Sequence, residues 1–154
     1  MISNGKFYES QFEEATIELL REAHWQYAFG DDIHRKYTDP LIEEDLRNFL
    51  AVQYKDKNLT TSEMDSIVAN LRNTGGQNDY YALRNTFLLY RDGYDFAYSD
   101  GRSNPFRLEY IDFEHPDHNI FRCVNQFVME QGRENRRPDI LLFINGIPDR
   151  KSVV

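Results

Sequence analysis

The sequence predicts a mixed α/β fold, of the α+β or mixed α/β type, with helices packed around one sheet. Helical periodicity dominates the chain up to Tyr90, and aromatic and β-branched segments typical of strands follow from Gly93 onward. The chain has 154 residues, of which 14% are aromatic, so it can bury a substantial core and is not expected to be disordered. We find no linker or repeat and expect a single domain over residues 1–148.

Composition narrows the classes of protein to consider. The formal net charge of −8 predicts a surface that repels nucleic acid as a whole, so any DNA contact needs a local basic cluster or a bound metal. The single cysteine, Cys123, allows no internal disulfide and favours a buried thiol in a reducing compartment. The first residues are too polar for a signal peptide, and no apolar run is long enough for a membrane helix. We therefore expect a cytoplasmic protein without membrane contact.

The first helix is expected over residues 10–23, with an apolar face formed by Phe12, Ala15, Thr16, Leu19, Leu20 and Ala23. Glu13 interrupts this pattern because it falls between Ile17 and Leu20 on the helical wheel. Two explanations stay open. Ser10 and Glu13 have the spacing of a capping box, and Glu13 could equally be a metal ligand. Glu9 has a similar angle and is the alternative helix acid.

The remaining elements follow from caps, breakers and periodicity. An irregular connection is expected over residues 26–40, and further helices over residues 40–54, 61–73 and 79–90. Strands are expected over residues 94–98, 106–113 and 120–129. The acidic run of residues 43–45 is interpreted as a solvated face at a helix N-terminus.

The most informative stretch is a strand with an acid at its start. Five apolar residues, 140–144, follow Asp139 and predict a buried strand, and Asn145-Gly146 predicts a type I′ hairpin turn after it. A carboxylate at the start of a buried strand is explained by an Arg partner, a turn cap or a metal ion. A metal site would need a returning strand, from about Pro148, that carries a second acid and a lysine.

Other polar groups have both a structural and a functional interpretation. Arg136 and Arg137, just before Asp139, could neutralise nearby acids or grip DNA phosphates. Asn125 and Gln126 could be an ordinary polar pair or could reach DNA. His115 and His118 lie three residues apart without a cysteine or third histidine nearby, so this spacing does not indicate a zinc site.

Three stretches carry a family resemblance. They read Glu-Ser-x-Phe-Glu-Glu-Ala at residues 9–15, Asn-x-Phe-x-Cys-Val-Asn-Gln-Phe at 119–127, and Asn-Arg-Arg-Pro-Asp-Ile-Leu-Leu-Phe-Ile-Asn-Gly-Ile-Pro at 135–148. In this order, with Trp25 and the Gly-x-Asp-Ile of residues 30–33 between the first two, they resemble the N-terminal part of the restriction (HsdR) subunit of type I restriction enzymes. The resemblance covers residues 7–148.

The resemblance implies a PD-(D/E)XK nuclease domain, restriction-endonuclease-like, with a central mixed sheet flanked by helices. It implies Mg²⁺-dependent cleavage of double-stranded DNA, together with modification and specificity subunits and an ATP-driven motor elsewhere in the same polypeptide. The family's aspartate falls on Asp139, and its helix glutamate on Glu13, so both are expected as catalytic metal ligands. Arg136, Arg137, Asn125 and Gln126 are the expected DNA contacts.

This sequence departs from the family at its end. The family's Glu-x-Lys falls at Val153, where the sequence has no such motif. We therefore expect a C-terminally truncated fold that does not cleave DNA, and a non-native tail over residues 149–154. The alternatives are a non-catalytic DNA-binding or assembly module with a nuclease-like fold, and a stand-alone nuclease of the same superfamily.

Overall fold

The computed structural model describes residues 4–37, 39–74, 88–131, 134–136 and 139–148. The chain forms two compact units, one of residues 1–42 with 120–154 and one of residues 43–119, and each is described by itself. Helices and a mixed sheet are both present, which confirms the predicted mixed α/β class. None of the described helices is long and apolar enough to cross a membrane. The tail over residues 149–154 lies outside the described residues and stays a prediction.

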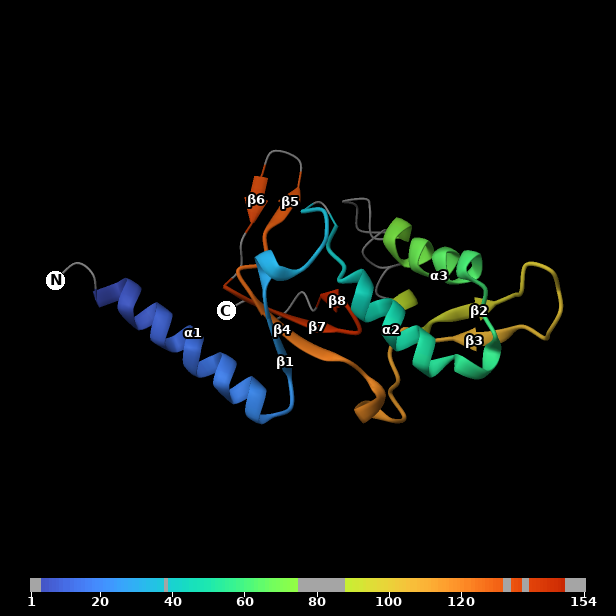
Figure 1. Ribbon diagram of the computed structural model, residues 1–154, viewed down its shortest axis with the longest axis horizontal. Coiled ribbons are helices and arrows are strands. Elements are labelled where there is room, and N and C mark those ends of the chain that lie inside the picture. The colour runs from blue at the N-terminus through green and yellow to red at the C-terminus, as the bar shows by residue number, and fades with distance from the viewer. Residues whose placement is uncertain (1–3, 38, 75–87, 132–133, 137–138, 149–154) are drawn as a thin grey trace. The chain divides into compact units, whose positions relative to one another are not determined.

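The first unit is built on a four-stranded mixed sheet (Figure 1). Its strands, in spatial order, are β1 (Gln26–Phe29), β4 (Phe121–Asn125), β7 (Ile140–Ile144) and β8 (Ile147–Pro148). β1 runs parallel to β4, whereas β7 is antiparallel to β4 and β8 is antiparallel to β7. One end of the sheet therefore collects the last residues of β1 and β4 and the first residues of β7.

Strand β1 corrects the prediction of an irregular connection over residues 26–40. The strand is only four residues long, with its first residue exposed, so its local pattern is weak. Its extended state depends on parallel pairing with β4, in which Tyr27 lies opposite Cys123. Next to the strand, the ring of Trp25 packs against Phe121 with centroids 5.1 Å apart. The strand that pairs with β1 thus lies roughly 100 positions further along the chain, so short-range sequence patterns do not reveal β1.

The hairpin after β7 confirms the prediction from Asn145-Gly146. Asn145 has φ 53° and Gly146 has φ 78°, and Ile144 pairs with Ile147 across the turn. Asn145 is also fully buried, and its side-chain oxygen accepts a hydrogen bond of 2.7 Å from the backbone N–H of Ile120. The turn therefore also holds the chain that leads into β4.

A compact apolar core lies beside this sheet. Phe127 and Phe143 are fully buried with ring centroids 4.9 Å apart, and they pack together with Ile42, Val124 and Leu141. The Cys123 thiol is buried, as expected, and burial raises its pKa.

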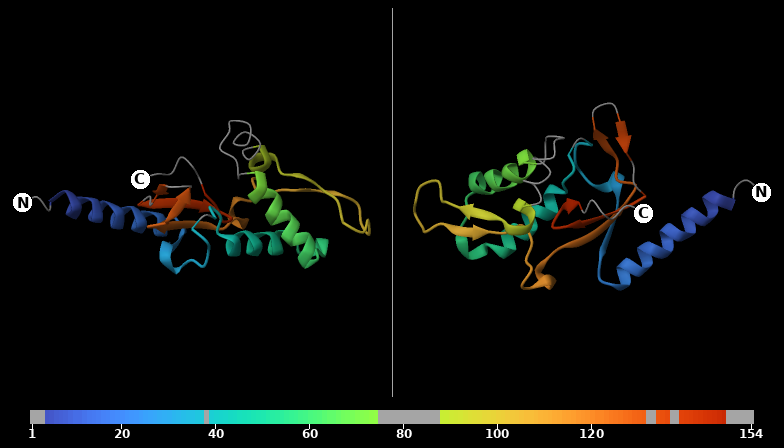
Figure 2. Two further views of the ribbon diagram at one scale, coloured as in Figure 1. Left: turned by 90° about the horizontal axis from the view of Figure 1, so that it is seen from above. Right: turned by 180° about the vertical axis from the view of Figure 1, so that it is seen from behind.

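Helix α1 (Asn4–Glu22) begins earlier than predicted, and this changes the interpretation of Ser10. Ser10 lies inside the helix, so it is not the N-cap, and the capping-box explanation of Glu13 is wrong. The predicted apolar face is also wrong, since Phe12 is 62% and Leu19 67% exposed. Figure 2 shows the N-terminal half of α1 extending beyond the edge of the sheet. The half-buried side of the helix carries Glu13, together with Ile17 and Leu20.

The strand expected over residues 120–129 is divided in the structure. β4 ends at Asn125, Gln126 adopts a left-handed φ of 58°, and β5 (Met129–Gln131) then pairs with β6 (Glu134–Arg136). A left-handed residue cannot continue a strand, so the direction of the chain changes there. The described strands consequently form three sheets, and the prediction of one sheet is wrong.

The second unit contains helices and a small antiparallel sheet. Its elements are α2 (Glu43–Gln53), α3 (Thr61–Thr74), β2 (Tyr94–Phe96) and β3 (Phe106–Leu108), with 3-10 turns η2 (Lys55–Lys57) and η3 (Pro116–His118). α2 begins three residues later than predicted, and β2 and β3 are shorter than predicted. Residues 75–87 of the expected fourth helix lie outside the described residues, and residues 88–92 are helical. In the acidic run, Asp45 is buried with 4% exposure, so the prediction of a solvated face is wrong there.

The start of α3 is held by a capping box and an ion pair. The backbone N–H of Glu63 donates to the Thr60 hydroxyl at 3.1 Å, and the Thr60 N–H donates to the Glu63 carboxylate at 2.9 Å. Arg102 donates to both oxygens of the same carboxylate, at 2.5 and 3.2 Å. The Arg102 guanidinium, followed by the Thr60 backbone, lowers the pKa of Glu63 to about 2.

Replacing Thr60 by Ala is expected to destabilise the protein by about 1 kcal/mol, because α3 loses its cap. The Glu63 carboxylate should also make stability depend on pH. Its folded pKa lies below the ordinary 4.5, so its contribution is complete above pH 4.5 and is lost as the pH falls toward about 2. Urea midpoints measured at pH 6 and pH 3 test this prediction. Glu63→Gln should show a smaller loss between the two pH values than the unchanged protein, and an equal loss would contradict the assignment.

Candidate functional site

Asp139 lies at the end of the sheet where β1 and β4 finish. β7 begins with Ile140 opposite Asn125, the last residue of β4. The backbone N–H of Gln126 donates to the carbonyl oxygen of Asp139 at 3.1 Å, which extends this pairing by one residue. The Asp139 side chain is exposed. A carboxylate anchored through its backbone to a sheet, with its oxygens open to solvent, is available to a metal ion or a ligand.

Glu13 reaches the same end of the sheet through Asn125. The side-chain N–H of Asn125 donates to the Glu13 carboxylate at 3.2 Å. The Tyr27 hydroxyl donates to the side-chain oxygen of Asn125 at 2.6 Å. This chain of hydrogen bonds joins β1, β4 and α1. It supplies a reason for the acid on the packed side of the helix that does not require a cap.

The chemistry of these partners fixes the orientation of the Asn125 amide. A Glu carboxylate is an acceptor when ionised, so it takes the amide N–H₂ side, and the amide oxygen then faces Tyr27. Burial, with smaller contributions from Cys123 and Glu13, raises the pKa of Tyr27, which keeps its hydroxyl protonated as the donor. The amide oxygen of Asn125 therefore accepts a hydrogen bond from Tyr27, and its amide nitrogen donates one to Glu13.

The donors at this end of the sheet suit Mg²⁺. Both Asp139 and Glu13 offer carboxylate oxygens, the ligands that this cation prefers, and Mg²⁺ is commonly held by one or two carboxylates together with water and substrate phosphates. Within the described residues, neither acid belongs to a group of three donors close enough to hold an ion. Within the part of the chain that the structure describes, water and bound phosphate would have to complete the coordination of a cation held by these two acids.

The other predicted site residues are placed in different ways. Both polar groups of the Asn125 side chain are hydrogen-bonded within the fold, to Tyr27 and Glu13. Gln126 directly follows β4 and is half-buried. The backbone of Arg136 ends β6, opposite Met129. Arg137 lies outside the described residues.

Sequence reasoning missed two residues that support this end of the sheet. One is Tyr27, which lies in the strand that was not predicted. The other is Gly30, at the start of η1 (Gly30–Asp32), where a Cβ atom would lie 2.1 Å from the carbonyl oxygen of Gln126. Only glycine allows the two backbones to approach so closely. A glycine directly after a strand-like segment was the available signal for this contact.

The chain matches one known protein family along nearly its whole length. The family described as "Type I restriction enzyme R protein N terminus" matches residues 6–149. The chain is similar to the type I restriction enzyme HindI endonuclease subunit of Haemophilus influenzae, with 30% identity over 91% of the chain and 14% of the relative. It is also similar to the putative type I restriction enzyme MjaIXP endonuclease subunit of Methanocaldococcus jannaschii, with 28% identity over 88% of the chain and 14% of the relative.

No solved structure matches the chain significantly. The chain spans about one seventh of the length of the two curated relatives, 14% in each case. The matched region includes Glu13, Asn125 and Asp139, and thus every described residue of the candidate site. On these grounds, the chain belongs to the family of N-terminal regions of type I restriction enzyme R proteins.

Proposed function

We propose that this chain is the nuclease region of the restriction subunit of a type I restriction-modification system, and that Asp139 and Glu13 hold Mg²⁺ there. The observation that carries the proposal is the hydrogen bond from Asn125 to Glu13 at the end of the sheet where Asp139 stands. It supports a site assembled from α1, β4 and the start of β7, although these segments are distant in the sequence. The similarity to subunits named as restriction endonucleases supports the nuclease parent.

Each residue then has a distinct task. Bound Mg²⁺ supplies Lewis acidity at a phosphoryl oxygen and an activated water. Asp139 offers carboxylate oxygens from a fixed backbone, and Asn125 orients the carboxylate of Glu13. Arg136 and Arg137 are proposed to contact DNA phosphates, for which planar guanidinium groups are suited. Gln126 is proposed as a further DNA contact beside them.

The partners and cofactors of the complete protein belong to the same proposal. We propose double-stranded DNA as the substrate, and modification and specificity subunits as partners, in the cytoplasm. We propose that ATP is used by motor domains in another part of the subunit. This chain covers only 14% of each curated relative and contains no Gly-x-x-x-x-Gly-Lys-Ser/Thr phosphate loop of its own. The sequence also contains no Glu-x-Lys after Asp139. The 154-residue polypeptide alone is therefore expected to leave DNA uncut.

Glu13→Gln and Asn125→Ala test the proposal in the complete subunit, assembled with its partners and supplied with Mg²⁺ and ATP. Loss of an outer residue that orients a metal ligand typically costs about 10–100-fold in metal affinity or activity, so Asn125→Ala should slow cleavage by this amount and raise the Mg²⁺ concentration needed. Glu13→Gln should slow cleavage at least as much. DNA cleavage and ATP hydrolysis are measured in the same samples.

Glu14→Gln is the matched control, because Glu14 is the exposed neighbour of Glu13 on the same helix. It should cleave like the unchanged subunit. ATP hydrolysis should persist in all three variants, which separates a nuclease defect from misfolding. DNA cleavage by Glu13→Gln at the unchanged rate would refute the assignment of Glu13 to the Mg²⁺ site. Efficient Mg²⁺-dependent nicking by the 154-residue polypeptide would show that the described acids are sufficient for cleavage without a Glu-x-Lys.

A further inference from the structure

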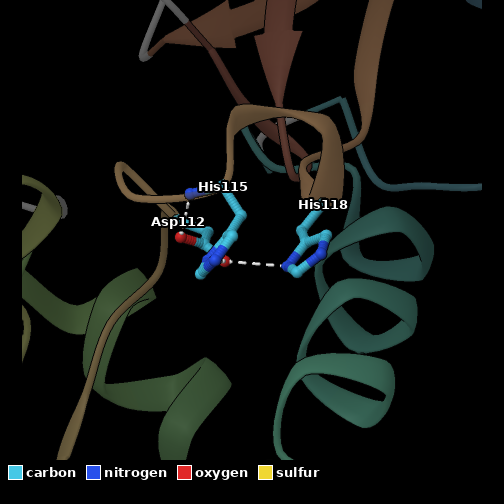
Figure 3. A group of neighbouring side chains, drawn as sticks. All are labelled: Asp112, His115 and His118. Atoms are coloured by element: carbon cyan, nitrogen blue, oxygen red, sulfur yellow. Dashed lines mark hydrogen bonds and ion pairs between the residues drawn. The ribbon is translucent and has the colours of Figure 1, made fainter.

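A second group of possible metal ligands lies in the other unit, in the loop that follows Ile111. Asp112, His115 and His118 each offer one ligand atom, and these three atoms lie within 4.8 Å of one another. Figure 3 shows the two imidazole rings and the Asp112 carboxylate gathered at one point of the loop. The rings are stacked, with centroids 4.8 Å apart and an interplanar angle of 17°. The spacing of the histidines did not indicate a metal site, and Asp112 is the third donor that the fold adds.

The Asp112 carboxylate is held in a fixed direction. One of its oxygens accepts backbone N–H groups from Glu114 at 3.1 Å and His115 at 2.8 Å. The other oxygen accepts the side-chain N–H of Gln53 at 2.9 Å and faces both imidazoles. Side-chain exposure of Asp112 is only 7%. A buried carboxylate, oriented by three donors, is the type of support that surrounds ligands in protein metal sites.

The loop itself is closed by Asn119. The Asn119 side-chain oxygen accepts the Asp112 N–H at 2.9 Å, and its side-chain nitrogen donates to the carbonyl oxygens of Asp112 at 2.8 Å and Pro116 at 3.1 Å. These bonds join the two ends of the segment that carries the histidines. The three donors therefore stand on one short loop whose ends are tied together.

The distances from Asp112 to the two imidazoles are close to those between ligands of one tetrahedral cation. Zinc–nitrogen and zinc–oxygen bonds of about 2.0–2.2 Å place neighbouring tetrahedral ligands about 3.3–3.6 Å apart. The facing oxygen of Asp112 lies 3.0 Å from Nδ1 of His118 and 3.6 Å from Nδ1 of His115. The imidazoles are 60% and 50% exposed at their side chains, so a cation can enter from solvent and keep a water as its fourth ligand.

We propose that Asp112, His115 and His118 form a binding site for a divalent transition-metal ion of the Zn²⁺ type. Two imidazole nitrogens and one carboxylate oxygen favour Zn²⁺ and its neighbours over Mg²⁺ and Ca²⁺, which prefer oxygen ligands alone. This site shares no residue with the proposed Mg²⁺ site, since all of its residues belong to the unit of residues 43–119. It does not depend on the proposed nuclease function.

Zn²⁺ titration of the untagged, chelator-treated 154-residue protein tests the site by calorimetry. One equivalent should bind, and His115→Asn and His118→Asn should each weaken binding by at least about tenfold, because each removes one of three protein ligands. Both side chains are exposed, so these variants should keep the fold, which circular dichroism checks. Co²⁺ provides a second readout, because its visible absorption reports four-coordinate nitrogen and oxygen ligation.

The chain supplies its own matched control in the other two histidines, His24 and His34. Both lie in the first unit and are exposed, and His24 has a positive φ of 70°, which Asn tolerates. The double variant His24→Asn/His34→Asn should bind Zn²⁺ like the unchanged protein. The proposal is overturned if the unchanged protein binds no Zn²⁺, if the control loses binding, or if His115→Asn/His118→Asn binds Zn²⁺ as tightly as before.

Discussion

Replacing Asp139 by Asn is expected to lower DNA cleavage by the complete restriction subunit at least about 100-fold, because metal-ion stabilisation of a phosphoryl transition state supplies several kcal/mol and each 1.4 kcal/mol is a factor of ten. Asn keeps the shape of the side chain and removes the charge that attracts Mg²⁺. The backbone of Asp139 should stay paired with Gln126, since that hydrogen bond uses the carbonyl oxygen. The measurement is the rate of linearisation of a circular DNA substrate with Mg²⁺ and ATP.

The Asp139→Asn variant should retain its fold, because the side chain is exposed. Thermal unfolding of the 154-residue chain with and without the change should agree closely, as for most surface substitutions. Asp56→Asn is a suitable control, since this exposed carboxylate lies in the other unit and on neither of the segments that form the two proposed metal sites. Cleavage by Asp139→Asn at the rate of the Asp56→Asn control would refute the assignment of Asp139.

Replacing Phe143 by Ala should have the largest effect on stability, a loss of about 3–5 kcal/mol. Phe143 is fully buried, packs against the tilted ring of Phe127 and belongs to the core beside the mixed sheet. Truncation removes a large apolar surface and leaves a cavity that neighbouring strands cannot fill without breaking their pairing. Urea unfolding followed by circular dichroism measures the loss. The geometry of the proposed Mg²⁺ site should also be disturbed, because Phe143 lies in β7, the strand that directly follows Asp139.

Phe12→Ala provides the same chemical change at an exposed position of the same unit. Phe12 is 62% exposed on α1, so its truncation should alter stability by no more than about 0.5 kcal/mol. The contrast between the two variants measures burial alone. A large loss for Phe12→Ala would show that the exposed side of α1 is covered in solution, and an equal, small loss for both would contradict the core assigned here.

The parts of the fold that could be predicted are those whose causes are local. The apolar run of residues 140–144 and the Asn145-Gly146 turn specify β7 and its hairpin within a dozen residues, roughly the range over which turn and strand preferences act. α3 could be predicted in the same way, because its capping residue stands directly before the segment with helical periodicity. β1 was missed because its pairing with β4 is non-local, and the start of α1 was misplaced because Ser10 has the spacing of a cap without being at a helix end.

The candidate sites show the same division. The unusual placement of Glu13 could be detected on a helical wheel, and Asp139 from its position before a buried strand. Neither pattern could name Asn125 as the residue that orients Glu13, because that requires α1 and β4 to be placed in space. The loop of Asp112 was missed for a different reason. Its donors recur every third residue, but Asp112 was assigned to a strand, where it would not have faced the histidines.

The hydrogen bond between Asn125 and Glu13 has a consequence for the order of events during synthesis. Its partners are 112 positions apart, and Asn125 is itself held in place by pairing with Ile140. Contacts of such long range form late, because the intervening chain must first be closed into a loop. A nascent chain that has passed Glu13 therefore carries an acid without orientation. The proposed nuclease centre can therefore be assembled only when nearly the whole of this region has left the ribosome.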